Sequence, residues 1–344
     1  MLKPLVKQAM QDVWAACDGA DLILPSSLSY YAGFSASEGL GIPWMQTYLL
    51  PIHVTREFPS SLIPSGLWLG GAGNWLSHWI TGYSYWWMLR GTYNAVRKEL
   101  YGSKPWPLKG IFGDIDKQGI PALYGFSPSV IPKPRDWADH LHVTGYWFLD
   151  ESAAWKPPAA LNYFLEEGPT PVYIGFGSMT NRDPVSVTRL VLDALRQSGQ
   201  RGLLLTGWGG VAEQVADEHR DDVFVLESAP HDWLFPRMAA VVHHGGAGTT
   251  AAGLRAGVPS IVIPFFGDQP WWGQIVYRKG VGPKPIPRGK LTVDKLAKAI
   301  KQAVSDTAMR ERASKLGKAI RAEDGVGEAV RLVEGWMERV SSAA

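Results

Sequence analysis

A short run of histidines, glycines and threonines carries the side chains of this chain that could do chemistry. The sequence HHGGAGTT at 243–250 follows the apolar run 239–242 and precedes the helix-compatible run 251–256. Glycines let a backbone approach an oxyanion closely, and the first N–H groups of a helix lack partners inside the helix. The helix dipole favours negative charge at the same end. We therefore predict a strand, a glycine turn and a helix start, here called the cradle, which bind a phosphate or diphosphate through His244, Gly246, Gly248, Thr249 and Thr250. The preceding His243 fits either a ligand donor or a buried strand end.

The spacing of the glycines in the cradle also fits a second kind of ligand, a dinucleotide. Gly246, Gly248 and Ala251 satisfy the dinucleotide pattern G-x-G-x-x-G/A. Asp268 stands at the end of the next predicted strand, about where a ribose-binding acid is expected. This pattern predicts an NAD-dependent oxidoreductase. It gives no role to the paired histidines or to Gln269 beside Asp268.

The longer segment around the cradle closely resembles the donor-sugar signature of nucleotide-sugar-dependent glycosyltransferases. Its wording, HHGGAGTTAAGLRAGVP followed by PFFGDQPWWG, is similar to the sterol 3-beta-glucosyltransferase branch. The resemblance implies two Rossmann-like domains, the α/β arrangement called GT-B. It also implies inverting transfer of a hexose, expected to be glucose from UDP-glucose, to a sterol or other lipid-like hydroxyl. The family needs no metal and no further cofactor, since the UDP-sugar is a co-substrate.

The same resemblance gives individual residues roles in binding the donor. His244 matches the diphosphate-binding histidine, and Asp268 and Gln269 match the pair that contacts the sugar hydroxyls. A carboxylate and an amide can bind neighbouring hydroxyls and so distinguish one hexose from another. Ser178 and the turn 207–210 are expected to close over the diphosphate and nucleoside. The predicted donor site comprises Gly177, Ser178, Gly207, Trp208, Ser228, Ala229, His244, Gly246, Gly248, Thr249, Thr250, Asp268 and Gln269.

Two departures from the family's patterns shape the functional prediction. The plant secondary-metabolite branch stacks its base on a tryptophan and binds ribose through a glutamate, where this chain has Ser228 and Ala252. The sterol branch differs from that branch in the same way. The glycine-rich loop whose acid is the candidate acceptor base has no match in 1–60, so we expect the N-terminal domain to be incomplete and assign no catalytic residue. A catalytically inactive donor-binding fragment is therefore the alternative function.

Composition narrows the class of protein. The chain of 344 residues is long enough for two domains with substantial cores. A formal net charge of +2 creates no strong field for nucleic acid, so no nucleic-acid partner is expected. Cys17 is the only cysteine, which excludes an internal disulfide and suits a reducing compartment. The first residues lack the order of a signal peptide, and the expected location is the cytoplasm.

Alternating helix and strand patterns predict how the elements are arranged. Apolar residues at helical spacing indicate helices at 3–16, 35–40, 293–304 and 328–340. Short apolar runs indicate strands at 21–25, 42–48, 171–176, 202–206, 223–226, 239–242 and 260–264. Successive βα units predict a parallel, doubly wound sheet with ligands beyond the carboxyl ends of its strands. The expected divisions are a partial acceptor-binding domain at 1–150, a linker at 151–170, a donor-binding domain at 171–322, and a helix at 323–344 that returns to the first domain.

The stretch 58–89 is aromatic and contains no Asp, Glu, Lys or Arg. It could form an apolar acceptor pocket, a lid that touches a membrane, ordinary core, or a membrane-spanning helix, for which about 20 apolar residues suffice. Its glycines and polar residues disfavour spanning. We predict an acceptor pocket or lid that binds a sterol or other lipophilic acceptor through Trp75, Trp79 and Trp86. A peripheral membrane contact is a further expectation.

Overall fold

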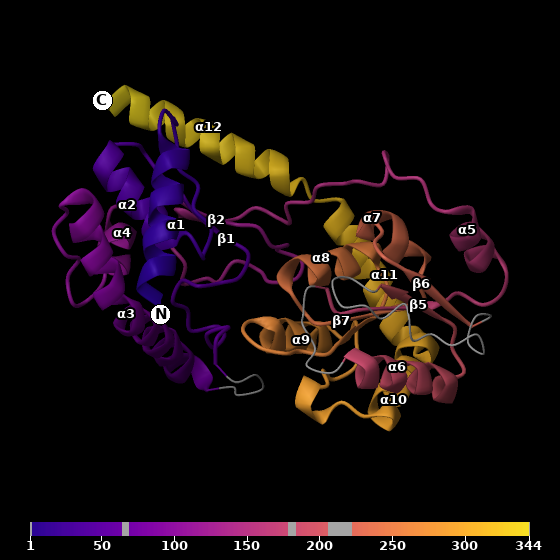
Figure 1. Ribbon diagram of the computed structural model, residues 1–344. Coiled ribbons are helices and arrows are strands. Elements are labelled where there is room, and N and C mark those ends of the chain that lie inside the picture. Colours follow the sequence, from indigo (N-terminus) through magenta and orange to yellow (C-terminus); the bar gives the residue numbers. More distant parts are fainter. Residues whose placement is uncertain (1, 64–68, 178–183, 206–221, 344) are drawn as a thin grey trace. The chain divides into compact units, whose positions relative to one another are not determined.

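The computed structural model describes residues 2–63, 69–177, 184–205 and 222–343 (Figure 1). The predicted site residues Ser178, Gly207 and Trp208 lie outside the described residues. The chain divides into two compact units. The first comprises Met1–Ile63, Leu67–Trp147 and Asp324–Ala344, and the second is built on Phe148–Glu323.

The second unit contains a five-stranded parallel sheet. Its strands are β4 (Val172–Gly175), β5 (Gly202–Leu205), β6 (Val223–Leu226), β7 (Ala240–His243) and β8 (Ser260–Val262). They lie in the order β6-β5-β4-β7-β8, so the chain crosses over between β6 and β7. Doubly wound sheets bind ligands beyond the carboxyl ends of the strands, where the strand order reverses. Here that point lies between β4 and β7, whose register pairs Gly175 with His243.

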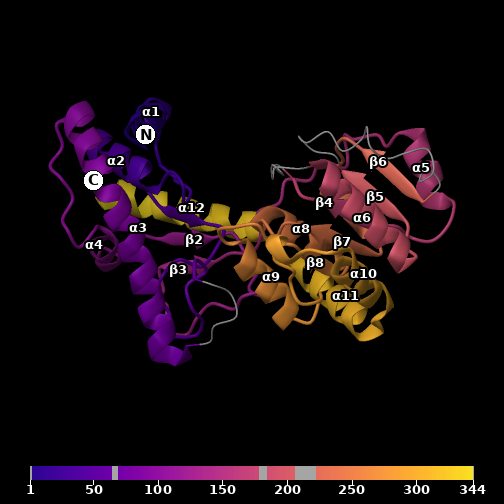
Figure 2. The ribbon, with the colours of Figure 1, turned by 60° about the horizontal axis from the view of Figure 1, so that its bottom comes forward.

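Helices cover both faces of this sheet (Figure 2). They are α5 (Ala159–Glu166), α6 (Pro184–Ser198), α7 (His231–Leu234), α8 (Ala247–Ala256), α9 (Gln269–Arg278), α10 (Val293–Ser305) and α11 (Thr307–Arg321), with short 3-10 turns η3 (Phe235–Arg237) and η4 (Arg288–Lys290). Side-chain caps fix two of the helix starts. Thr292 accepts a hydrogen bond from the N–H of Lys295, and Asp306 accepts one from Met309. Neither α9 nor α11 is among the helices predicted from the sequence.

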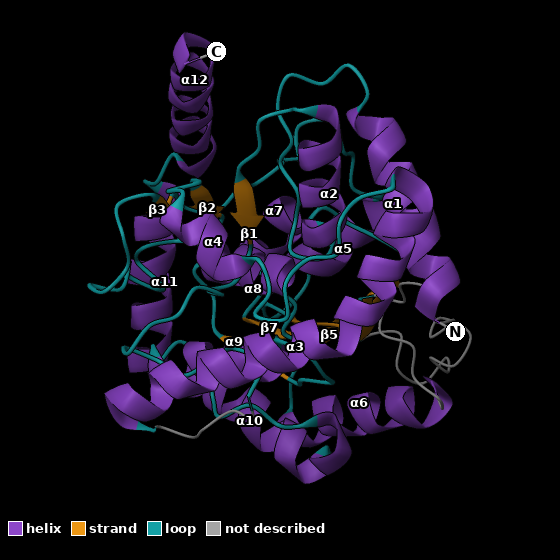
Figure 3. Ribbon diagram, turned by 90° about the vertical axis from the view of Figure 1, so that its left-hand side faces the viewer, coloured by secondary structure: helices purple, strands orange, loops and turns teal. Residues whose placement is uncertain are grey.

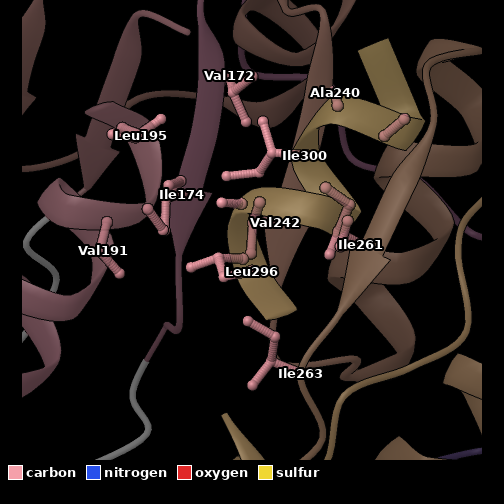
Figure 4. Packing of buried hydrophobic residues seen from close by; sticks show 14 of the residues in the cluster. Val172, Ile174, Val191, Leu195, Ala240, Val242, Ile261, Ile263, Leu296 and Ile300 are labelled. Atoms are coloured by element: carbon pink, nitrogen blue, oxygen red, sulfur yellow. The ribbon is translucent and has the colours of Figure 1, made fainter. Parts of the chain in front are cut away.

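Apolar side chains fill the space between the sheet and its helices. Ile174 and Val242 from the sheet pack in one buried cluster with Val191 of α6 and with Leu296 and Ile300 of α10 (Figure 4). A second cluster fills the other face, around α7 and η3. Each aliphatic side chain buried in this way contributes about 1.5–3 kcal/mol. Because both faces are covered, the strands are continuous apolar runs, which is why sequence alone could predict them.

The first unit has a smaller parallel sheet of order β1-β2-β3. The strands are β1 (Gln46–Tyr48), β2 (Ala122–Tyr124) and β3 (Leu141–Val143). The helices of this unit are α1 (Leu2–Cys17), α2 (Tyr30–Leu40), α3 (Gly70–Tyr101), α4 (Phe112–Lys117) and α12 (Gly325–Ala343). With 32 residues, α3 is the longest of the described helices (Figure 3).

Two strands predicted for this unit are shorter than expected. The strand predicted at 21–25 is reduced to a single bridge between Ile23 and Trp44. The N–H of Ile23 donates to the carbonyl of Pro43. In a regular parallel ladder the next donor from the same strand would be the N–H of residue 25, but Pro25 has no N–H. The strand predicted at 42–48 is likewise shortened to β1.

A buried guanidinium fastens α3 to α2. Arg97 is 4% exposed, and its Nη1 donates to Oγ of Ser35 at 2.9 Å and to Oε2 of Glu38 at 2.8 Å. The guanidinium also lies 3.8 Å from the centre of the Trp106 ring. A buried charge is stable only when paired in this way. The contacts therefore fix the position of α3, which forms a wall of the cavity described below.

Candidate functional site

The loop after β7 places His244 beside the start of α8. The ring is half-buried, and its Nδ1 has no hydrogen-bond partner among the described residues. Gly246 is the N-cap of α8, and a side chain there would collide with Nε2 of His244. Gly177 follows β4 with φ 59°, and a Cβ there would stand 3.3 Å from Cε1 of His244. The structure thus brings Gly177, His244 and Gly246 together. The imidazole excludes a larger residue at position 246, and the positive φ of Gly177 favours glycine there.

The cradle has an open end and a buried end. The first hydrogen bond of α8 runs from the N–H of Thr250 to the carbonyl of Gly246, at 2.9 Å, so the N–H groups before it have no partner inside the helix. Gly248 is exposed with open space around it, and Thr249 is half-buried. Thr250 is fully buried, and its hydroxyl has no partner in the described part of the chain. Gly248 and Thr249 are therefore the residues of the cradle best placed to meet a ligand.

His243 closes the strand rather than facing solvent. Its ring is fully buried, and its Nδ1 accepts a hydrogen bond from the N–H of Gly245 at 3.1 Å. Burial lowers the pKa of His243 to about 3, so the ring is neutral. Gly245 has φ 91°, a conformation that favours glycine. Of the two roles open from sequence, these contacts favour the strand end, where His243 holds the turn into α8.

Asp268 lies at the start of α9 and not at the end of a strand. It is the N-cap of α9, whereas β8 already ends at Val262. Its Oδ2 accepts a hydrogen bond from Nε1 of Trp272 at 3.0 Å. Burial raises the pKa of Asp268, while hydrogen bonds from its own backbone N–H and from Trp272 and the proximity of His244 act in the opposite direction. One oxygen of the carboxylate is thus held in place by the indole of Trp272.

Gln269 is more deeply buried than its predicted role requires. It is 4% exposed, and its Oε1 accepts hydrogen bonds from the N–H groups of Phe265 at 2.8 Å and Phe266 at 3.3 Å. A Cβ on Gly245 would stand 3.1 Å from the carbonyl oxygen of Gln269, so the cradle and the start of α9 are in contact. Gln269 therefore shapes the loop that carries Asp268.

The remaining predicted donor residues lie on the loop after the edge strand β6. Ser228 is exposed, and Ala229 is half-buried against the second apolar cluster. In the strand order, β5 separates β6 from β4. These two residues are therefore placed toward one end of the sheet rim, while Asp268 is placed toward the other.

The first unit contains a cavity of about 310 Å³, which is in the size range of small-molecule sites. Trp75, Trp79 and Trp86, the three predicted acceptor contacts, all line it. Trp86 is a buried wall whose Nε1 donates to the carbonyl of Leu108 at 3.0 Å. Other aromatic walls are Tyr48, Tyr83, Phe112 and Trp137. Flat aromatic walls of this kind suit a flat apolar ligand.

Several polar groups of this cavity are already engaged. Asp136 accepts hydrogen bonds from the hydroxyl of Thr55 at 2.6 Å and from the N–H of Arg56 at 2.7 Å. Nε2 of His78 donates to the carbonyl of Phe58 at 3.1 Å. These contacts hold the loop after β1, whose residues Ile52, His53 and Val54 line the cavity.

A histidine–tyrosine pair in the cavity wall escaped the sequence analysis. His53 lines the cavity, and both its backbone N–H and its Nδ1 are hydrogen-bonded to the hydroxyl of Tyr124 on β2. Asp116 also lines the cavity and accepts a hydrogen bond from Nε2 of His140 at 3.0 Å. Because β1 and β2 are parallel neighbours, residues after them meet at one sheet edge. The position of His53 shortly after the strand predicted at 42–48 was the feature of the sequence that could have indicated this pair.

The outer surface of α3 is unusually apolar. Exposed residues include Trp75, Leu76, Trp79, Ile80 and Trp87. The guanidinium of Arg90 lies 4.2 Å from the centre of the Trp87 ring. Within the described residues, no helix is both long and apolar enough to cross a membrane.

Comparisons with known proteins identify relatives of this chain. A sterol 3-beta-glucosyltransferase of Arabidopsis thaliana is 41% identical to this chain over 91% of its length. One of Neosartorya fischeri is 37% identical over 98%. The predicted resemblance to the sterol glucosyltransferase branch is confirmed. The chain spans only 48% and 24% of the length of these two relatives. Residues 212–334 also match the family model of the erythromycin biosynthesis protein CIII-like C-terminal domain.

Solved structures confirm the predicted fold class. The glycotransferase of kitacinnamycin matches with a TM-score of 0.66 at 22% identity, over 94% of this chain and 79% of that chain. Glycosyltransferase VinC, solved in complex with DTDP, matches with a TM-score of 0.59 at 19% identity, over 94% and 75%. At such identities the likeness shows the fold alone. The α/β fold of these glycosyltransferases is thus the fold of this chain.

Proposed function

We propose that this chain binds a UDP-sugar, UDP-glucose by preference, at the cradle and transfers its hexose to a sterol or similar lipid hydroxyl with inversion. The observation that carries the proposal is the position of His244 beside Gly177 and the start of α8, with an Nδ1 that has no hydrogen-bond partner among the described residues. The similarity to sterol 3-beta-glucosyltransferases supports this choice of substrates and favours it over an oxidoreductase.

The cradle offers what the departure of a nucleoside diphosphate demands. Negative charge grows on the leaving phosphate as the bond to the sugar breaks. The first N–H groups of α8, which have no partner inside the helix, the helix dipole and one N–H of His244 would stabilise that charge. One well-placed donor of this kind is worth about 3 kcal/mol in the barrier. Asp268, held by Trp272, would accept a hydrogen bond from a sugar hydroxyl.

The cavity of the first unit is the proposed place of the acceptor. Its walls are aromatic, and a sterol presents a flat apolar ring system with one hydroxyl. The exposed residues Trp75 and Trp79 on α3 also line this cavity, so its rim is part of the protein surface. A lipid acceptor could therefore enter along α3.

We infer in addition that the exposed face of α3 lies against a lipid bilayer. Tryptophan is enriched at membrane interfaces, where one end of the side chain is apolar and the other is hydrated. Removing Trp79 and Trp87 together (W79A/W87A) should reduce binding to phosphatidylcholine–phosphatidylserine vesicles, measured by co-sedimentation. Removing the exposed Tyr163 of α5 (Y163A) should leave binding unchanged. Equal binding by all three proteins would contradict the membrane contact.

The experiment that tests the function combines transfer and binding. The purified chain is incubated with radiolabelled UDP-glucose and cholesterol in cyclodextrin, and the glucoside is separated by solvent extraction. Labelled cholesterol glucoside is the expected product. Binding of UDP-glucose without transfer would instead support the donor-binding module. Tight binding of NADH with no response to UDP would support the oxidoreductase.

A further inference from the structure

We propose that Nε2 of His53 donates a hydrogen bond to the hydroxyl oxygen of the acceptor, and that Tyr124 positions His53 for this contact. The inference rests on the proposed acceptor site, because it concerns the polar end of a ligand in the same cavity. His53 and Tyr124 belong to the loop after β1 and to β2, and they are 71 residues apart in sequence.

The hydroxyl of Tyr124 decides which nitrogen of His53 carries the proton. Its oxygen accepts a hydrogen bond from the backbone N–H of His53 at 3.2 Å. Tyr124 is fully buried, so its own hydrogen must also find an acceptor. The acceptor in contact with it is Nδ1 of His53. The neutral imidazole then carries its hydrogen on Nε2.

The charge states of both groups agree with this assignment. Burial lowers the pKa of His53 to about 4, so the ring is neutral near neutral pH. Burial also raises the pKa of Tyr124, so the phenol keeps its hydrogen. A neutral ring bonded to a phenol through Nδ1 is a donor on its other side and cannot be a base there.

Aromatic neighbours hold the ring of His53 in one orientation. The rings of Tyr48, Tyr124 and Trp137 lie edge-on to it, with centroids at 5.8, 5.8 and 6.2 Å. In the described part of the chain, no hydrogen bond is recorded for Nε2 of His53. His53 thus offers this largely aromatic cavity an oriented N–H donor for which the described residues supply no partner.

The other polar groups of the cavity are less suited to this role. Asp136 is held by Thr55 and Arg56, and His78 by Phe58. The phenol of Tyr48 donates to Oε1 of Gln46 at 2.8 Å. By contrast, Nε2 of His53 matches the oxygen of a single hydroxyl on an otherwise apolar ligand.

The test compares two ligands that differ only in the hydroxyl, cholesterol and cholest-5-ene. Both are delivered in cyclodextrin, and binding is followed by tryptophan fluorescence. The unaltered chain should prefer cholesterol by about five- to tenfold, the effect of one neutral hydrogen bond. His53→Phe should abolish the preference and leave the affinity for cholest-5-ene nearly unchanged. His53→Gln, whose amide also donates, should restore part of the preference.

Two further variants separate positioning from packing. Tyr124→Phe keeps the ring but removes the hydroxyl, so Nδ1 can take the hydrogen and the preference should fall. Tyr83→Phe removes another hydroxyl from the cavity lining and should leave the preference intact. A preference that survives in His53→Phe, or that disappears in Tyr83→Phe, would overturn the inference. Failure of the unaltered chain to bind either ligand would overturn the proposed acceptor instead.

Discussion

The imidazole of His244 lies so close to Gly177 that a Cβ there would stand 3.3 Å from Cε1 of the ring. The two residues are 67 positions apart, but they follow β4 and β7, which are hydrogen-bonded neighbours at the centre of the sheet. The strand order reverses at this place, so both loops face the same region beyond the strand ends. The backbone of Gly177 therefore lies beside the imidazole of His244.

Replacing Gly248 by alanine should raise the stability of the chain and weaken the binding of its ligand. It lies in the first turn of α8, is exposed, and has no atom close enough to exclude a side chain. Gly248→Ala should therefore stabilise the free chain by about 0.5–1 kcal/mol, since alanine favours helix. It should also weaken UDP binding at least several-fold, because a methyl group would stand where a phosphate approaches the backbone. Urea unfolding and calorimetry measure the two effects.

The matched control for this substitution is Gly91→Ala in α3. Gly91 is also helical and exposed, with open space around it. The change should stabilise the first unit by a similar amount and leave UDP affinity unchanged. Undiminished UDP binding by Gly248→Ala would contradict the placement of the diphosphate at α8.

His243 should make the second unit sensitive to acid. Its pKa is lowered to about 3 in the folded chain, against about 6.5 when unfolded. As the pH falls, the unfolded chain takes up the proton first, so stability present above about pH 6.5 is lost toward pH 3. This loss amounts to about 2 kcal/mol between pH 7 and pH 5.

His243→Asn isolates this contribution. The amide oxygen of asparagine can still accept the hydrogen bond from the N–H of Gly245, but it does not titrate. The variant should lose about 2 kcal/mol less than the unaltered chain between the same two pH values, by urea unfolding. An unchanged pH dependence would show that His243 is not buried as a neutral ring.

The edge beside Ile23 should promote self-association. The backbone of Ile23 is hydrogen-bonded to Pro43 and Met45, just before β1. No hydrogen bond joins the backbone of Leu22 or Leu24 to a neighbour among the described residues. Leu24 is 46% exposed. Open apolar edges pair with other chains, and a lysine opposes such pairing. Leu24→Lys should therefore reduce the oligomer fraction in sedimentation velocity, whereas Leu149→Lys, in an exposed loop, should not.

Local sequence was sufficient to predict the cradle and the sheet that carries it. Histidines, glycines and an apolar strand at 239–250 act through backbone geometry that neighbours in sequence determine. The helix α11 could also have been found, because Met309, Ala313, Gly317 and Ile320 recur at helical spacing after Asp306. The many charged residues between them obscured that pattern.

Other features depend on contacts between distant residues and could not be predicted. The tautomer of His53 is set by Tyr124, which lies 71 residues further along the chain. Whether the tryptophans of α3 face a cavity or the surface depends on how Arg97 fastens that helix to α2. The helical spacing of apolar residues shows that they share one face of a helix, but it does not show whether that face packs against the core, lines a cavity or is exposed to solvent.

The central claim is that His244 and the start of α8 bind the diphosphate of a UDP-sugar, and calorimetry with UDP tests it most directly. The unaltered chain should bind UDP, and His244→Ala should weaken that binding by about 1.5–3 kcal/mol, the range for hydrogen bonds to charged groups. Asp268→Ala should leave UDP affinity nearly unchanged and alter only the discrimination among UDP-sugars. Equal UDP affinity in the unaltered chain and His244→Ala, or no UDP binding at all, would contradict the account.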